Sequence, residues 1–400
     1  MARDGAIISV IDDVGWLRDV LVQGPVGSAP ERAGWGASGN ARDAVRQHEA
    51  FVRELERAGV TVRRLDALLA SALGFADARD WIVERRVGEY VDDRRSGSEI
   101  VSWMSEQPAE TLIRFLMEGT PVSALPTRIV HLDDVASRHD GWFLPPLVNP
   151  MQLRAGLRFI EAGAVVCPHP PAASRASAIT ISTVLNFAPL FDESRFEFWL
   201  TSDGADRSCP PIDGHDIAMP GRLVCVGGIT HATSLRAFSE LAASLFRRNR
   251  NYTVFCLDLA GAGCECLDDC FVPLDRETVL VDSAVLGRAR AFSVRAHPHG
   301  MALTVEPCGS AFLDEFARAL GGADLCLIDM KEHTGSVGSA LSRLAPIVLS
   351  PGRIMVFEQH HAAFHLLEQH GIEIVSVLDG SALSRGGKGP RGLMSALRAG

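Results

Sequence analysis

The stretch AVRQHEAFVRELERAGVTVRRL, residues 44–65, contains one complete unit of the fold. Its first part predicts a helix, because apolar residues recur at helical spacing and would share one face: Val45, Phe51, Val52 and Leu55. Gly59 then ends the helix, and VTVRRL begins a strand. A helix followed directly by a strand is the connection expected in α/β proteins.

The same plan recurs at residues 235–259, 312–330 and 362–380. In the first of these stretches the apolar residues again have helical spacing: Leu235, Phe238, Leu241, Leu245 and Phe246. A supersecondary unit that is repeated along a chain indicates modules arranged around one centre.

Residues 65–121 break this pattern, because four helical segments follow one another without a strand candidate: LDALLASALG, ARDWIVERRVG, GSEIVSWMSEQ and AETLIRFLMEG. We therefore predict two parts. An α/β body comprises residues 1–64 and 122–400, and a helical insertion comprises residues 65–121.

Composition limits the classes of function. With 47% hydrophobic and 22% charged residues the chain can form a large core, and the net charge of −10 argues against a nucleic-acid surface. The N-terminus has no basic segment followed by an apolar run, and no stretch approaches the length of a membrane span. These features predict a soluble, cytoplasmic protein without nucleic-acid or membrane partners.

The nine cysteines are scattered, which favours reduced, buried thiols in a chain without a signal peptide. Only CECLDDC, with Cys264, Cys266 and Cys270, forms a cluster. Its spacing matches zinc sites poorly, and alternation along a strand would direct the side chains to opposite faces. We therefore predict no metal and no cofactor, with soft-metal binding by this cluster as the alternative.

Several phrases resemble the motifs of one family: WLRDVLVQGPV (16–26), ADARDWIVERRVG (76–88), LPPLVNPMQLRAG (144–156), DGHDIAMPGRLVCVGGITHATS (213–234), ECLDDCFVP (265–273) and GSALSRGGKGPRGLM (380–394). The chain resembles bacterial arginine deiminases, of the guanidino-group-modifying superfamily. This resemblance implies a fivefold pseudosymmetric α/β propeller, a pentein, with an inserted helical bundle. It also implies a small guanidino or amino-acid ligand.

The resemblance implies a chemistry that this chain departs from. In the family a cysteine thiolate attacks the guanidinium carbon, a histidine moves protons, and carboxylates hold the planar cation. Here the nucleophile's place is Gly392, the histidine's place is Cys266, and one carboxylate's place is Ala155. Because glycine has no side chain, we do not expect standard cysteine-dependent deimination.

Other family positions remain polar. The resemblance makes the following residues candidates for substrate binding: Asn149, Asp213, Asp216, Asp268, Arg385 and Arg391. Cys266 is a candidate replacement nucleophile and His215 a candidate base. The alternatives are a buried thiol at position 266 and a histidine that pairs with Asp216 for structural reasons.

Three hypotheses of function stay open. The chain is a pseudoenzyme that binds a guanidino or amino-acid ligand or a partner protein, or it is a repurposed enzyme for an arginine-derived or otherwise cationic substrate. In either case Asp213 and Asp268 would hold the cation. Alternatively, it is a catalytically dead structural or regulatory subunit that pairs with an active relative. The family's fold also leads us to expect a homo-oligomer, a dimer or higher.

Overall fold

A computed structural model describes residues 7–26, 41–91, 94–126, 141–168, 172–192, 196–200, 209–297, 302–322, 324–330, 341, 344–384 and 389–400. Arg385, one of the predicted binding residues, lies outside these ranges.

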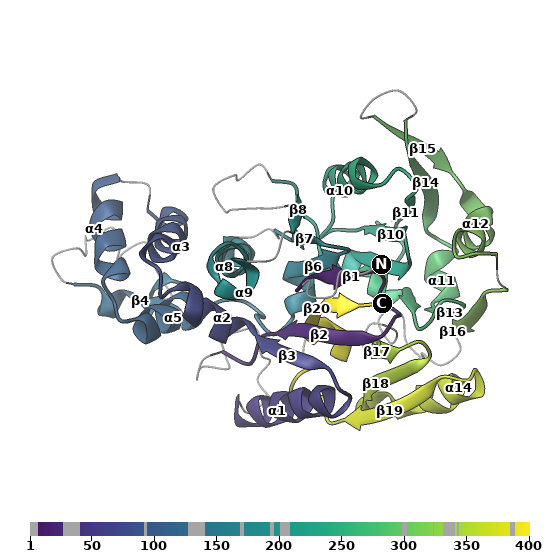
Figure 1. Cartoon of the computed structure of the whole chain (residues 1–400), viewed down its shortest axis with the longest axis horizontal. Helices are drawn as coiled ribbons and strands as arrows, with labels where there is room; N and C mark the ends of the chain where they lie inside the picture. Colours follow the sequence, from purple (N-terminus) through teal and green to yellow (C-terminus); the bar gives the residue numbers. More distant parts are fainter. Residues whose placement is uncertain are drawn as a thin grey trace.

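Five modules with the same strand plan form the body of the molecule (Figure 1). In each module two antiparallel strands are followed by a connection and by a third strand, which runs parallel to the second. The three-strand sets are β20-β2-β3, β6-β7-β8, β9-β10-β11, β12-β13-β16 and β17-β18-β19. Helices α1, α8, α10, α12 and α14 lie outside the strands in Figure 1.

The first two modules contain the chain termini and the segment that follows the helical insertion. The first consists of β20 (Met394–Ala399), β2 (Leu17–Val22), α1 (Ala41–Arg57) and β3 (Thr61–Arg64). The second consists of β6 (Leu157–Ile160), β7 (Gly163–Val166), α8 (Ala172–Phe187), α9 (Pro189–Asp192) and β8 (Glu197–Leu200). The second module was not predicted from the sequence.

The third and fourth modules are interleaved. The third consists of β9 (Ile217–Gly221), β10 (Val224–Ile229), α10 (Leu235–Arg248) and β11 (Thr253–Asp258). The fourth consists of β12 (Phe271–Pro273), β13 (Thr278–Val281), α11 (Ser283–Leu286), η4 (Gly309–Ala311), α12 (Phe312–Ala319) and β16 (Cys326–Asp329). Between α11 and η4, β14 (Arg290–Ala296) and β15 (Leu303–Pro307) extend the sheet of the third module.

The fifth module completes the body. It consists of β17 (Ile347–Ser350), β18 (Arg353–Phe357), η6 (Glu358–Ala363), α14 (Phe364–Gln369) and β19 (Glu373–Leu378). All four predicted helix-and-strand stretches therefore contain a helix followed by a strand, and the α/β class is confirmed. The closed fivefold propeller stays a prediction.

Four helices occupy the stretch that was predicted to be helical: α2 (Leu65–Ala72), α3 (Ala76–Gly88), α4 (Arg94–Ser105) and α5 (Ala109–Glu118). They gather at one side of the molecule, at the left of Figure 1, where α2 and α3 contact α8 of the body. The short strand β4 (Thr120–Pro121) follows, leads into η1 (Val122–Ala124) and pairs with β5 (Trp142–Leu144). The division into two domains stays a prediction.

Two residues of the predicted helix faces point to solvent instead. The side chain of Val45 is 47% exposed and that of Leu235 is 63% exposed. In α1 the buried stripe runs through Ala44, His48 and Phe51, so Val45 lies about 100° away from its centre. Both residues lie near the start of their helix, where a residue beside the apolar stripe escapes burial.

The two chain ends meet in one sheet. Strand β1 (Ser9–Val10) pairs in parallel with β20, and β20 pairs antiparallel with β2. Figure 1 shows both termini near the middle of the molecule. Among the described residues, no helix is both long and apolar enough to cross a membrane.

The position of β20 between β1 and β2 makes its core side chains important for stability. Leu397 is fully buried there. We expect Leu397→Ala to lower the free energy of unfolding by about 2–5 kcal/mol, because it leaves a cavity between sheet and core. Chemical denaturation measures this loss. Leu235→Ala is the control and should change stability by less than about 0.5 kcal/mol; equal losses in the two variants would contradict the assignment of β20 to the core.

Candidate functional site

Four short helical turns build the centre of the molecule, and each precedes the first strand of a module. They are α7 (Leu153–Gly156), η2 (Gly214–Asp216), η3 (Leu267–Asp269) and η7 (Pro390–Leu393). Turn α7 contacts both η2 and η7, and η2 contacts η3. Equivalent positions in four modules therefore bring polar residues together from distant parts of the chain.

Local sequence explains the turns. Asp213 precedes η2, and its carboxylate accepts a hydrogen bond from the backbone N–H of His215, as an N-cap does. Pro390 begins η7 with a backbone angle suited to a first helical position. Gly214 is required at the contact between η2 and α7, because an added Cβ would lie 1.9 Å from the carbonyl oxygen of Arg154.

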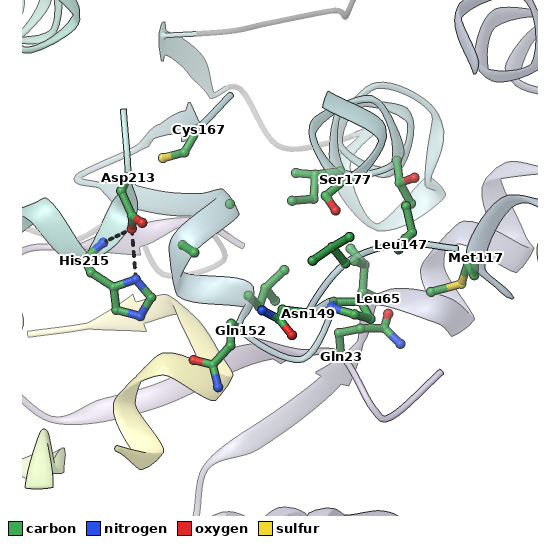
Figure 2. Close-up of a pocket in the computed structure, with 17 residues that line it drawn as sticks. Gln23, Leu65, Met117, Leu147, Asn149, Gln152, Cys167, Ser177, Asp213 and His215 are labelled. Atoms are coloured by element: carbon green, nitrogen blue, oxygen red, sulfur yellow. Dashed lines mark hydrogen bonds and ion pairs between the residues drawn. The ribbon is translucent and has the colours of Figure 1, made fainter. Parts of the chain in front are cut away.

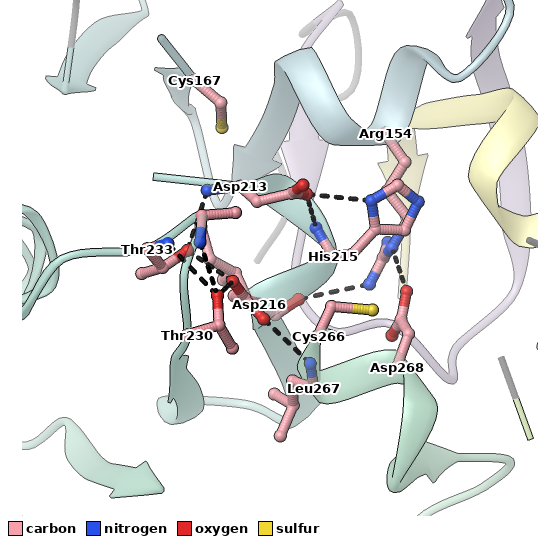
Figure 3. A network of polar contacts seen from close by, with 12 residues as sticks. Arg154, Cys167, Asp213, His215, Asp216, Thr230, Thr233, Cys266, Leu267 and Asp268 are labelled. Atoms are coloured by element: carbon pink, nitrogen blue, oxygen red, sulfur yellow. Dashed lines mark hydrogen bonds and ion pairs between the residues drawn. The ribbon is translucent and has the colours of Figure 1, made fainter. Parts of the chain in front are cut away.

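A buried cluster of five charges lies beneath these turns. Asp13 accepts a hydrogen bond of 2.6 Å from Arg158 and one of 2.9 Å from Arg391. Arg154 donates to Asp268 at 2.9 Å and lies 3.7 Å from Asp13. Each of the five side chains is at most 4% exposed. Three arginines and two aspartates are thus shielded from water and neutralise most of one another's charge. Figure 3 shows the pair of Arg154 and Asp268.

The cluster keeps Asp13 ionised. Burial acts to raise the pKa of Asp13, but the guanidinium groups of Arg158, Arg391 and Arg154 outweigh it and hold that pKa well below its usual range. Burial and the neighbouring Arg154 lower the pKa of Arg391 to about 10, so this arginine stays charged at neutral pH. The cluster is therefore fixed as a set of paired ions.

Asp213 and His215 form a hydrogen-bonded pair above the cluster (Figure 2). The Nδ1 atom of His215 lies 2.9 Å from Oδ1 of Asp213. A carboxylate only accepts hydrogen bonds, so Nδ1 carries the hydrogen and Nε2 presents a lone pair. The Nε2 atom is buried and has no hydrogen-bond partner among the described residues.

Asp216 belongs to a network that adjoins the Asp213–His215 pair, because Thr233 accepts a hydrogen bond from the backbone N–H of Asp213 (Figure 3). The Asp216 carboxylate accepts hydrogen bonds from the hydroxyl groups of Thr230 and Thr233 and from the backbone N–H of Leu267. Burial and repulsion from the Asp213 carboxylate raise the pKa of Asp216 to about 7, although these hydrogen bonds oppose the shift. The proposed structural pairing of His215 with Asp216 is corrected: the partner is Asp213, because its capping position places it against both the backbone and the ring of His215.

Gly392 lies at the meeting point of two buried polar atoms. A Cβ added to Gly392 would lie 2.2 Å from Oε1 of Gln152 and 3.2 Å from Nε2 of His215. Neither Oε1 of Gln152 nor Nε2 of His215 has a hydrogen-bond partner among the described residues. The space that a side chain at position 392 would take is therefore occupied in part by the amide of Gln152.

A cavity of about 280 Å³ opens beside this point (Figure 2). Its polar end contains Asp213, His215, Gln152 and Asn149. Its walls are mostly apolar: Leu65, Met117, Leu147, Val148, Leu153, Ala155, Gly156 and Ile181. A cavity with apolar walls and a few convergent polar groups has the composition of a small-molecule site.

Comparison with known proteins assigns the family. A sequence profile described as "Arginine deiminase" matches residues 39–398. The chain belongs to the arginine deiminase family. Among similar relatives, arginine deiminase from Bacillus cytotoxicus is 24% identical over 362 residues, which cover 86% of this chain and 85% of the relative. Arginine deiminase from Listeria innocua is 23% identical over 361 residues, with the same coverage of 86% and 85%.

Solved structures of low sequence identity show the fold alone. An amidinotransferase of saxitoxin biosynthesis from Microseira wollei has a TM-score of 0.56 at 13% identity, covering 98% of each chain. DDAH from Pseudomonas aeruginosa, complexed with citrulline, has a TM-score of 0.51 at 12% identity, covering 95% of this chain and 99% of the other. Inosamine-phosphate amidinotransferase from Streptomyces griseus has a TM-score of 0.51 at 15% identity, covering 98% and 97%. These likenesses place this arginine deiminase relative in the α/β pentein fold.

The structure brings only some of the predicted site residues to the cavity. Asn149, Asp213 and His215 line it. Asp268 and Arg391 lie in the charge cluster instead, where Asp268 is already bound to the guanidinium of Arg154. A ligand cation at Asp268 would have to displace that internal guanidinium, so the expectation that Asp268 faces a ligand directly is not met.

Cys266 is not among the described residues that line the cavity. It caps η3, with its thiol 3.3 Å from Oδ1 of Asp269, and its side chain is buried. The role of Cys266 as a replacement nucleophile stays a prediction. Within the described part of the chain, no group of three or more histidine, cysteine or acidic side chains is arranged to hold a metal ion.

A different thiol lines the cavity. Cys167 is buried, and both this burial and the nearby charge of Asp213 raise its pKa well above the usual range. A protonated thiol is a poor nucleophile, because the thiolate is the reactive form. Cys167 therefore lacks the activation that a covalent mechanism at this site would require.

Sequence analysis missed three residues that organise the site: Asp13, Gln152 and Arg154. Arg154 and Gln152 belong to the motif LPPLVNPMQLRAG, so comparison with the family motif was the available signal. Asp13 lies in the stretch IDDVGW outside the recognised motifs, and its partner Arg391 is 378 positions away. No local pattern marks that contact.

The charge cluster predicts strong coupling between Arg154 and Asp268. We expect Arg154→Met to lower stability by about 3–5 kcal/mol, because it leaves a buried carboxylate without its main partner. Adding Asp268→Asn to this variant should restore part of the loss, since no buried charge is then left alone. Chemical denaturation of both single variants and the double variant measures the coupling; losses that simply add would show that the two side chains do not depend on each other.

The raised pKa of Asp216 predicts that the free energy of unfolding depends on pH. Between pH 3.8 and about 7 the unfolded chain releases a proton that the folded protein retains. Stability from this group is therefore greatest below pH 3.8 and falls as pH rises to about 7, by a few kcal/mol. Asp216→Asn does not titrate, so its stability should fall less than that of the wild type over this window. Chemical denaturation at several pH values measures this dependence. Parallel curves of unfolding free energy against pH for wild type and Asp216→Asn would contradict the prediction. Asp314→Asn, at an exposed position, is the control and should follow the wild-type curve.

Proposed function

We propose that this chain binds a guanidino or other cationic ligand in the cavity and does not carry out cysteine-dependent deimination. One observation carries the proposal: the polar end of the cavity holds the Asp213 carboxylate. The resemblance to arginine deiminases implies that Gly392 stands at the nucleophile's place. On this assignment the carboxylate is present without the sulfur at position 392 that would form the covalent intermediate.

Charge supports a cationic ligand. Asp213 is only 13% exposed, and its carboxylate accepts hydrogen bonds from the backbone N–H and from the ring Nδ1 of His215. A buried carboxylate favours a cationic partner, since charge-assisted hydrogen bonds are roughly twice as strong as neutral ones. The amide groups of Asn149 and Gln152 at the same end add acceptors for further N–H groups.

A repurposed acid–base enzyme is the second candidate, and the Asp213–His215 pair favours it. The carboxylate fixes the imidazole in the tautomer that presents Nε2, and this atom is buried beside Gly392 without a partner among the described residues. A histidine held in this way is able to accept a proton from a bound ligand or water. In this candidate His215 is the base and Asp213 its positioning residue. Cys266 stays a weaker prediction, because its thiol is bound to Asp269.

Binding is the most direct test. We expect a ligand such as guanidine or an alkylguanidine to raise the melting temperature of the wild-type protein, because it binds only the folded state. Asp213→Asn should abolish the shift by removing the negative charge at the polar end. Asp314→Asn is the matched control, with the same chemical change at an exposed position of α12, and should keep the full shift.

Two outcomes would overturn parts of the proposal. A shift that survives in Asp213→Asn would place the ligand elsewhere. Citrulline release from arginine at a rate typical of enzymes would contradict the loss of deimination, and Cys167→Ala would then show whether the cavity thiol is responsible. If no cationic compound binds, the remaining hypothesis is a structural or regulatory subunit. The predicted homo-oligomer stays a prediction.

A further inference from the structure

The cavity has two chemically different ends. Considered together, they restrict the chemical class of the ligand further than the requirement for a positive charge does. This inference rests on the proposed function, because it assumes that the cavity binds a cation. We infer that the ligand is a monocation whose guanidinium head is joined to an apolar body without a carboxylate.

The polar end is a cluster of acceptors. Nε2 of His215 and Oε1 of Gln152 both lie within 3.2 Å of one point, the position that a Cβ on Gly392 would take. Both atoms are buried and have no partner in the described part of the chain. The Asp213 carboxylate is bound to the same imidazole. A guanidinium matches this set, since it is planar, offers N–H groups on several sides and accepts no hydrogen bonds.

The walls away from Asp213 are largely apolar and well buried, and the neutral polar residues Gln23, Ser177 and Thr180 also line them. Five aliphatic side chains are at most 4% exposed: Leu65, Met117, Leu147, Leu153 and Ile181. Leu65 and Met117 come from α2 and α5, whereas Ile181 comes from α8. The helical segment and the body therefore both enclose the part of the ligand that lies away from Asp213. Such walls stabilise methylene groups, at roughly 0.8 kcal/mol for each one buried.

A carboxylate on the ligand would meet no cationic partner among the described residues that line the cavity, since none of them is a lysine or an arginine. Two arginines of the motifs, Arg154 and Arg391, are buried and paired with Asp268 and Asp13. Removing a carboxylate from water without a cationic partner is strongly unfavourable. An amino acid such as arginine would bring both a carboxylate and an ammonium group to this region.

The size of the cavity agrees with a compact ligand, since its volume is about 280 Å³. A pentyl chain serves as the apolar body in the test, because its methylene groups can lie against Leu147 and Ile181.

Calorimetric titration of the full chain with matched ligands tests the inference. n-Pentylguanidine and δ-guanidinovalerate have the same number of carbons in the chain, and only the second ends in a carboxylate. We expect n-pentylguanidine to bind about tenfold or more tightly than δ-guanidinovalerate. L-Arginine should bind more weakly still, and n-pentylamine should bind more weakly than n-pentylguanidine because its head offers fewer donors.

Variants that add a cation to the wall should reverse the preference. Val148 lines the cavity and is 43% exposed, so Val148→Arg is compatible with folding. Ser177 lines the cavity from α8 and is partly buried, so Ser177→Arg gives a second position. Each should improve the binding of δ-guanidinovalerate relative to n-pentylguanidine. Ser239→Arg, on α10 away from this cavity, is the matched control and should leave the ratio unchanged.

The outcomes separate the two proposals. If δ-guanidinovalerate or L-arginine binds as tightly as n-pentylguanidine, the inference about the carboxylate is wrong while the cation site stands. If n-pentylamine binds as tightly as n-pentylguanidine, the requirement for a guanidinium head is wrong. If none of the four compounds binds, the proposed function itself fails, and the inference fails with it.

Discussion

The carboxylate of Asp13 joins segments of three modules that lie far apart in the sequence. It follows β1, receives Arg158 from β6 and Arg391 from η7, and accepts a hydrogen bond from the backbone N–H of Met219 in β9. Three modules therefore meet at one buried anion. Breaking such a pair leaves a charge in a medium that solvates it poorly, so the positions of the turns around it are strongly constrained.

Ion pairs hold three of the central turns together. Arg154 in α7, Asp268 in η3 and Arg391 in η7 bind one another and Asp13. The turn η7 contains Gly392, and Gln152 fills part of the volume that a side chain at this position would take. The imidazole of His215 faces the same volume.

Much of the secondary structure could be predicted from the sequence, because α1 and α10 each have an apolar stripe at regular spacing. The second module was missed because α8 is rich in alanine, serine and threonine and has no strong polar face. For the site, motif resemblance indicated Asp213 and His215, which line the cavity. It could not show that Asp268 is bound internally, since that depends on the distance to Arg154 in the folded state.

The pairing of β20 with β1 and β2 also has a consequence for the order of events during folding. Arg391 and Asp13 are 378 positions apart, so the cluster gains this cation only when a very long stretch of chain closes into a loop. Until that loop closes, the Asp13 carboxylate lacks one of its cations and β2 lacks its antiparallel partner. Contacts between residues so far apart in sequence slow folding, so the central sheet and the charge cluster form together at a late step.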